Sequence, residues 1–279
     1  MKPELLSPAG DLEKLKTAIL YGADAVYMGG PALGMRAKAK NFCTRDMAEG
    51  IDFAKSKGKR VYVTANIFAH NADFDGMEEY FAKVQEMGAD ALIVSDPGVL
   101  QVAKKAAPNM ELHISTQANC TNIRSARFWK EQGASRVILA RELSLGEIGE
   151  IRVPGLAIEA FVHGAVCMAI SGRCLISNYM SGRDANRGEC SQPCRWNYSV
   201  VEEKSGETLD VYESENGAFV FSSKDLCMVC HIGELVDAGV KSLKIEGRMK
   251  TEYYVAIATK TYREAIDDFF ESPGLYKSK

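Results

Sequence analysis

The chain has 279 residues, of which 46% are hydrophobic and 9% aromatic, so it can bury a full core as one large domain or two small ones. Its formal net charge of −3 excludes the overall basic character of a dedicated nucleic-acid binder. The sequence begins without a secretory leader and contains no apolar run long enough to span a bilayer, which predicts a cytoplasmic protein without a membrane partner.

Eight short apolar segments recur along the chain, and most are followed by a segment with helical periodicity. The predicted strands are residues 4–8, 23–30, 60–66, 89–96, 111–117, 135–143, 157–164 and 241–248. Asp11 and Gly22 are placed to cap the first helix, and Pro97 to open the fourth. The pattern predicts an α/β protein, a single (β/α)8 TIM-like barrel over residues 1–279, with an open doubly wound sheet as the alternative.

One interval is far longer than a barrel crossover requires. Residues 165–240 separate the seventh and eighth predicted strands, and they carry six of the eight cysteines. Residues 197–223 alternate between polar and apolar side chains around two turn signals, which predicts a small antiparallel β excursion. We therefore expect a Cys-rich, partly antiparallel β insertion between strands 7 and 8.

Polar residues follow most of the predicted strands, where a barrel of this kind carries its functional groups. They are Asn66, Asp96, Gln117, Asn119, Arg141, Glu142, His163, Glu246 and Arg248. The Cys-rich insertion leaves from the same face, so we expect thiols and polar side chains to share an active site. Taken singly, each of these residues fits a loop cap or a salt bridge equally well.

The cysteines favour a metal site, because a reducing cytosol argues against a disulfide framework. Two sets of four fit such a site. Spacing favours zinc at Cys190, Cys194, Cys227 and Cys230. A second set, Cys167, Cys174, Cys190 and Cys227, has gaps suited to a cluster inside a large insertion. Several of these thiols could instead be buried small hydrophobic side chains.

The motifs in and around the insertion resemble a known family. The run EAFVHGAVCMAISGRCLIS (residues 159–177) closely resembles the signature of the peptidase U32 family. The later runs RDANRGECSQPCRW, SSKDLC and KIEGRMK and the opening ELLSPAG resemble the same family. The resemblance covers nearly the whole chain and is strongest to the branch that forms 5-hydroxyuridine in tRNA.

This resemblance implies a barrel-like catalytic domain and two classes of activity. The family was first described as collagenase-like peptidases, whereas better-understood relatives are oxygen-independent hydroxylases of tRNA wobble uridine, ribosomal RNA or the ubiquinone ring. It implies an iron-sulfur-dependent tRNA hydroxylase, with a peptidase or a cluster-carrying accessory subunit as alternatives. A small carboxylate such as prephenate and a paralogous U32 protein are the implied partners. The C-terminal domain of longer members is expected to be absent.

The resemblance also assigns residues. It implies a 4Fe-4S cluster on Cys167, Cys174, Cys190 and Cys227, with Cys194 as a substitute for Cys190 and zinc as the alternative metal. From position we expect three acid–base groups, Glu159, His163 and Glu246. The predicted substrate-binding residues are Asn66, Gln117, Asn119, Arg173, Lys224, Lys244 and Arg248. Proteolysis is the weaker hypothesis, because the sequence offers no His-Glu-x-x-His or Gly-x-Ser-x-Gly motif.

Overall fold

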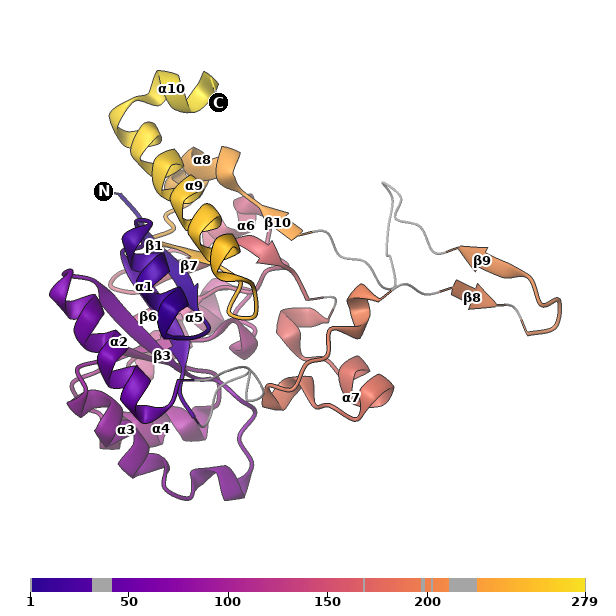
Figure 1. The fold of residues 1–279 in the computed structure, drawn as a ribbon, viewed down its shortest axis with the longest axis horizontal. Coiled ribbons are helices and arrows are strands. Elements are labelled where there is room, and N and C mark those ends of the chain that lie inside the picture. The colour runs from indigo at the N-terminus through magenta and orange to yellow at the C-terminus, as the bar shows by residue number, and fades with distance from the viewer. Residues whose placement is uncertain are drawn as a thin grey trace.

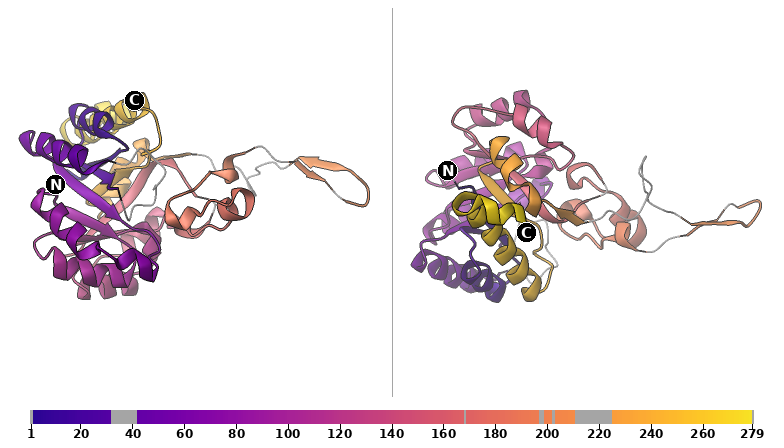
Figure 2. Two further views of the ribbon diagram at one scale, coloured as in Figure 1. Left: turned by 60° about the horizontal axis from the view of Figure 1, so that its bottom comes forward. Right: turned by 90° about the horizontal axis from the view of Figure 1, so that it is seen from above.

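The protein folds as a closed barrel of parallel strands surrounded by helices (Figures 1 and 2). The structure, a computed structural model, describes residues 2–31, 42–167, 169–196, 199–201, 203–210 and 225–278. In these ranges the barrel strands are β1 (Glu4–Ala9), β2 (Ala25–Gly29), β3 (Arg60–Ala65), β4 (Ala91–Val94), β5 (Glu111–Ile114), β6 (Arg136–Ile138), β7 (Ala157–Ala165) and β11 (Ser242–Ile245). β11 pairs in parallel with both β7 and β1, which closes the ring and confirms the predicted TIM-like barrel.

Helices cover the outside of the barrel. They are α1 (Leu12–Leu20), α2 (Thr44–Ser56), α3 (Met77–Glu86), α4 (Pro97–Ala106), α5 (Ile123–Glu131), α6 (Leu145–Glu150), α8 (Ile232–Asp237), α9 (Glu252–Glu271) and α10 (Pro273–Ser278). The Asp11 carboxylate accepts the Lys14 backbone N–H at 2.9 Å and so caps α1. Gly22, just beyond this helix, has a φ of 104°, which suits glycine. Pro97 is the first residue of α4, as predicted. No helix among the described residues is both long and apolar enough to cross a membrane.

The strands are buried on both faces, and the two faces pack against different partners. Alternate residues such as Leu5 and Val61 point outward into the large core beneath the helices. Their neighbours point inward and form a smaller apolar cluster inside the barrel, made of Leu6, Ala25, Tyr27, Tyr62, Ala91, Ile93 and Ile138. This cluster separates a polar layer at the amino ends of the strands from a pocket at their carboxyl ends.

The chain between β7 and β11 leaves the barrel. It contains α7 (Ile176–Ser181), an antiparallel hairpin of β8 (Ser199–Val201) and β9 (Thr208–Asp210), and β10 (Asp225–Cys227), which pairs antiparallel with the end of β7. Both figures show the hairpin well away from the barrel (Figures 1 and 2). Much of the predicted excursion over residues 197–223 lies outside the described residues.

Candidate functional site

A pocket opens at the carboxyl ends of the barrel strands and is closed on one side by the insertion. It encloses about 130 Å³ and is lined by residues from seven of the eight barrel strands or the segments that follow them. A cavity of about 150 Å³ holds one benzene-sized ring, so this pocket is of the right size for a single heterocycle. Its floor is the aromatic and aliphatic surface of Tyr27, Phe161, Ile93 and Ile138.

Amide and hydroxyl groups form one wall of the pocket. The Asn66 amide nitrogen donates to Ser115 Oγ at 3.1 Å and to Gln117 Oε1 at 2.9 Å. Asn66 directly follows β3, and Ser115 and Gln117 follow β5, so the convergence of strand ends brings them together. The Asn66 Oδ1 atom is buried and has no hydrogen-bond partner among the described residues.

Cations form a second wall. Lys244 on β11 is buried, and its Nζ lies 4.4 Å from the centre of the Tyr27 ring. Burial lowers the pKa of Lys244 even though Glu159 acts in the opposite direction. Arg248 is buried and donates to Thr64 Oγ1 at 3.1 Å. Arg141 follows β6, lies over the Phe161 ring at 4.0 Å and donates to the Ala165 carbonyl at 2.8 Å.

Four thiols form the third wall. Cys167, Cys174, Cys190 and Cys194 all line the pocket, and none is in a disulfide. Burial and then the neighbouring Cys167 and Cys190 raise the pKa of the Cys194 thiol, which agrees with this crowding. The wall is held by Ser171, whose N–H donates to Glu142 at 2.8 Å and whose hydroxyl donates to Asn119 Oδ1 at 2.8 Å.

Cys227 and His163 lie on a different surface. β7 pairs with β11 through Phe161 and then His163, so the register skips Val162 at a bulge. The bulge turns His163 outward, where its ring lies 5.7 Å from that of Tyr254 and 5.4 Å from that of Tyr262 on α9. Burial lowers the pKa of His163. Cys227 lies opposite His163 on β10, and neither residue lines the pocket.

The donor set has the chemistry that a 4Fe-4S cluster requires, since four thiols that form no disulfide line one cavity. Cys167, Cys174 and Cys190 from the expected ligand set are together there, with Cys194 as the fourth thiol of the wall. Over the described ranges, however, no three His, Cys, Asp or Glu side chains converge closely enough to hold a metal ion. The ligand assignment therefore stays a prediction.

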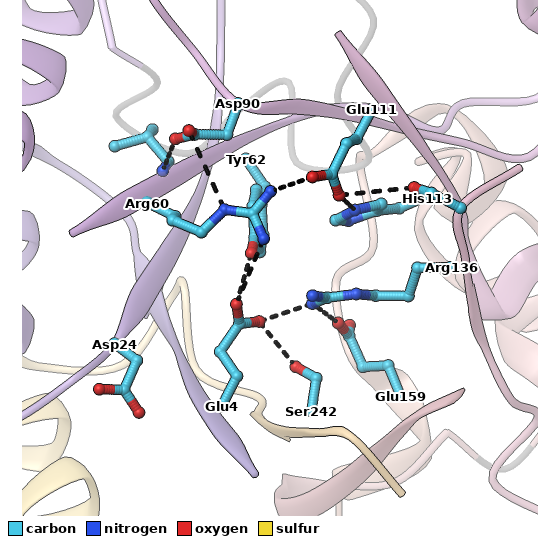
Figure 3. A network of polar contacts seen from close by, with 12 residues as sticks. Glu4, Asp24, Arg60, Tyr62, Asp90, Glu111, His113, Arg136, Glu159 and Ser242 are labelled. Carbon is cyan, nitrogen blue, oxygen red and sulfur yellow. Dashed lines mark hydrogen bonds and ion pairs between the residues drawn. The ribbon is translucent and has the colours of Figure 1, made fainter. Parts of the chain in front are cut away.

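Glu159 lies deeper in the barrel than a group facing the pocket would. It is fully buried near the amino end of β7, where Oε2 accepts from Arg136 at 2.8 Å and Oε1 from Lys244 at 2.9 Å. Arg136 also donates to Glu4 at 2.6 Å, within a charged layer that includes Tyr62 and Ser242 (Figure 3). Burial alone would raise the pKa of Glu159, but Lys244 and Arg136 outweigh it and lower the pKa to about 2. Its predicted acid–base role is untested.

The remaining predicted residues line the pocket, support it from behind or lie outside the described residues. The residues that line the pocket are Asn66, Gln117, Lys244, Glu246 and Arg248.

Arg173 and Asn119 support the pocket from behind. The Arg173 guanidinium donates to the Gln117 carbonyl at 3.2 and 3.0 Å and lies 5.4 Å from the centre of the Phe68 ring. Asn119 accepts the Ser171 hydroxyl. Lys224 lies outside the described residues.

Sequence reasoning missed Ser115, Ser171, Tyr27 and Phe161. A signal existed for two of them, because Tyr27 and Phe161 hold inward positions of strands with a period of two. The only sequence signal for Ser115 is its position directly after β5. Ser171 sits in the insertion with a φ of 49°, a backbone conformation that its sequence context does not signal.

Comparisons with known proteins agree with this architecture. The profile of peptidase family U32 matches residues 10–277. The chain is 46% identical over 273 residues to tRNA hydroxylation protein P1 of Bacillus subtilis (strain 168). The matched region covers 98% of this chain and 65% of that protein. It is 43% identical over 309 residues to tRNA hydroxylation protein P of Escherichia coli (strain K12), with 96% and 68% covered. The chain thus spans about two thirds of the length of these relatives.

A solved structure supports the fold alone. The U32 peptidase Mk0906 superimposes with a TM-score of 0.58 at 14% identity, covering 88% of this chain and 93% of that one. The family profile and the relatives extend over nearly all of the chain, including the strand ends and the insertion that build the pocket. As its motifs predicted, the chain belongs to peptidase family U32.

Proposed function

We propose that this chain hydroxylates RNA, and that its product is 5-hydroxyuridine at the wobble position of tRNA. The observation that carries the proposal is a ring-sized pocket whose walls combine amides, cations and four thiols. Two relatives named as tRNA hydroxylation proteins, at 46% and 43% identity, support the same reaction class. We propose that the protein acts in the cytoplasm, since cysteines used as metal ligands suit a reducing compartment.

We infer that the thiol wall holds a 4Fe-4S cluster, which when bound supplies electron transfer next to the pocket. Cys167, Cys174 and Cys190 would provide three ligands. The family resemblance names Cys227 as the fourth, whereas the pocket geometry favours Cys194. The zinc alternative requires Cys227 and Cys230, and neither lines the pocket.

The cation wall suits a small carboxylate as oxygen donor, such as prephenate. Replacing the C5–H of uridine with C5–OH oxidises the base by two electrons. The reaction balances if the donor exchanges its C–OH for C–H and is reduced by two electrons. Lys244 and Arg248 are buried beside the pocket and would orient the carboxylate through charge-assisted hydrogen bonds.

Exposed side chains of the insertion suit an RNA loop. Tyr179 lies on α7 and is 89% exposed. Leu175, which lies between Cys174 and the start of α7, is 74% exposed. Arg173 precedes α7 and Arg183 follows it, so both arginines lie next to these exposed side chains in the sequence. Aromatic platforms beside arginines bind splayed bases and phosphates. A paralogous U32 protein would complete the surface if this chain acts as one of a pair.

The peptidase alternative lacks support at the site. Thiol proteolysis needs a histidine base within hydrogen-bond reach of the nucleophile. No histidine lines the pocket, and the bulge in β7 turns His163 to the outer face. Hydrolysis of denatured collagen by the purified protein, lost on Glu246→Ala, would restore this alternative.

The test has two parts. The full chain is expressed in a bacterium from which its own tRNA-hydroxylation genes are deleted, and 5-hydroxyuridine is measured in digested tRNA by mass spectrometry. Anaerobically purified protein is analysed for iron, zinc and acid-labile sulfide. We expect the modified nucleoside together with about four irons and matching sulfide per chain. Unmodified tRNA, also after co-expression with a paralogue, would contradict the hydroxylase proposal, and zinc without sulfide would contradict the cluster.

A further inference from the structure

The amide wall contains a buried acceptor that the fold leaves unused. Both hydrogens of the Asn66 amide nitrogen are taken, by Ser115 Oγ at 3.1 Å and Gln117 Oε1 at 2.9 Å. These two bonds fix the orientation of the amide and leave Oδ1 buried without a partner. A buried carbonyl oxygen without a hydrogen bond destabilises the fold, so such an atom calls for an explanation.

A donor lies beside this acceptor. Gln117 is 5% exposed, and its Oε1 is already bound to Asn66. Its Nε2 makes no hydrogen bond to any described residue and points toward the thiol wall. A side-chain carbon placed on Gly172 would lie 3.9 Å from this nitrogen and 3.8 Å from Cys167 Sγ, so the amide and the thiol flank the same point. Asn66 and Gln117 therefore place one buried acceptor and one donor in the same wall of the pocket.

This pattern is complementary to one edge of uracil. The N3–H of uracil can donate to Asn66 Oδ1 while its O4 accepts from Gln117 Nε2. Cytosine has an acceptor at N3 and a donor at N4, so both contacts would become repulsive. The floor of Tyr27 and Phe161 supplies an apolar surface for the ring, and the volume of about 130 Å³ fits one ring.

The orientation has a chemical consequence. C5 of uracil is bonded to C4, which carries O4. If O4 binds the Gln117 amide nitrogen, C5 lies on the side of the ring that faces Gly172 and Cys167. The edge that identifies the base would thereby direct the reacting carbon toward the thiol wall.

We propose that the Asn66–Gln117 amide pair reads the Watson–Crick edge of an unpaired uridine inserted into the pocket, and so selects uridine over cytidine. The inference rests on the proposed RNA-hydroxylase function and names the residues that set its base specificity. Entry requires a base that is already splayed from a loop, since the pocket lies at the barrel mouth behind the insertion.

The test compares two fluorescent RNA stem-loops that differ only by uridine or cytidine at one loop position. Binding to anaerobically purified full chain is measured by anisotropy. A pair of contacts of this kind discriminates by about tenfold, so wild-type protein should favour the uridine loop by that factor. Gln117→Glu keeps the bond to Asn66 but replaces the donor, and should remove most of the preference. Asn66→Asp, which loses the fixed orientation, should also reduce it.

Asn109→Asp is the matched control, because it adds the same charge at an exposed loop position away from the pocket. It should leave the uridine-to-cytidine ratio unchanged. Wild-type protein that binds both loops equally, binds neither, or prefers cytidine would overturn the inference.

Nucleoside analysis of the same variants separates the two proposals. Formation of 5-hydroxyuridine with a ratio that neither variant changes would refute the amide pair and leave the hydroxylase standing. A ratio that the variants abolish, in a protein that never modifies RNA, would refute the hydroxylase and leave the base reading standing.

Discussion

The inside of this barrel has two polar layers that look alike in sequence and differ in what surrounds them. In the lower layer Glu4 and Glu159 share Arg136 (Figure 3). Lys244 also pairs with Glu159 and completes the charge balance. In the upper layer amides, thiols and cations surround a cavity. Unpartnered buried atoms occur in both, at Arg136 Nε below and Asn66 Oδ1 above. What distinguishes a candidate site is therefore an unused polar atom on a residue that lines a cavity.

The strongest way to separate the layers is to remove a thiol. Cys167→Ser should abolish bound iron and sulfide and 5-hydroxyuridine formation, because a cluster requires its thiolate ligands. Unfolding of the apo-protein should remain close to wild type. Cys43→Ser is the control, since Cys43 caps α2 and serine is a favoured cap. Full iron content in Cys167→Ser would contradict the ligand assignment, and comparing Cys194→Ser with Cys227→Ser identifies the fourth ligand.

In the lower layer we expect substitutions to lower the stability of the folded protein. Glu159→Ala leaves Arg136 and Lys244 buried without their shared carboxylate, so the free energy of unfolding should fall by about 3–5 kcal/mol. Chemical denaturation of the apo-protein measures this. Glu264→Ala removes the exposed partner of Lys260 and should cost less than about 1 kcal/mol. A Glu159→Ala protein of wild-type stability would mean that the buried pairs contribute nothing net.

The same carboxylate predicts an acid dependence. The pKa of Glu159 is lowered to about 2 in the folded protein, against about 4.3 in an unfolded chain. A carboxyl whose pKa is lowered on folding stabilises the protein above the unfolded value, and that stability is lost as the pH falls toward 2. Between about pH 4.3 and pH 2, wild-type stability should therefore fall more steeply than that of Glu159→Gln. Parallel curves for the two proteins would show that Glu159 is not the group involved.

Much of the fold could be predicted from sequence because it follows from local rules. Doubly buried strands, the Asp11 cap and the Pro97 start are set by residues close together in the chain. The convergence of strand ends brings Asn66, Gln117 and Arg248 together at one pocket, as their positions after the strands suggested.

The positions that the sequence does not indicate depend on long-range pairing. Glu159 meets Lys244 only because β7 and β11 are neighbours, and no local pattern marks that contact. His163 faces outward because of a bulge that depends on the same pairing. Cys194, rather than Cys227, shares the pocket with the other thiols because of how the insertion folds back, which spacing alone does not determine.

A smaller effect is expected where the upper layer meets RNA. Tyr179→Ala removes an 89% exposed ring, and stacking of one base on such a ring contributes about 1–3 kcal/mol. Affinity for the uridine stem-loop should fall by about 5- to 100-fold without a change in unfolding. Tyr21→Ala, at the end of α1, removes a ring that is 44% exposed and should leave RNA affinity unchanged. Equal losses in both variants would show that the contact is not specific to α7.

The smallest effect concerns the link between the insertion and the barrel. Both terminal nitrogens (Nη1 and Nη2) of the Arg187 guanidinium lie 2.8 Å from the Asp73 carboxylate, which fastens the insertion to the segment after β3. The bond to Arg187 lowers the pKa of Asp73 to about 2, so the link should hold above about pH 4. Because the pair is partly exposed, Asp73→Asn should cost about 1 kcal/mol or less in unfolding. Limited proteolysis at neutral pH should nevertheless cut the insertion of this variant faster, while the barrel fragment survives. Equal cleavage rates would mean that the thiol wall is held in place by its own contacts, Ser171 with Glu142 among them, and does not depend on the arginine link.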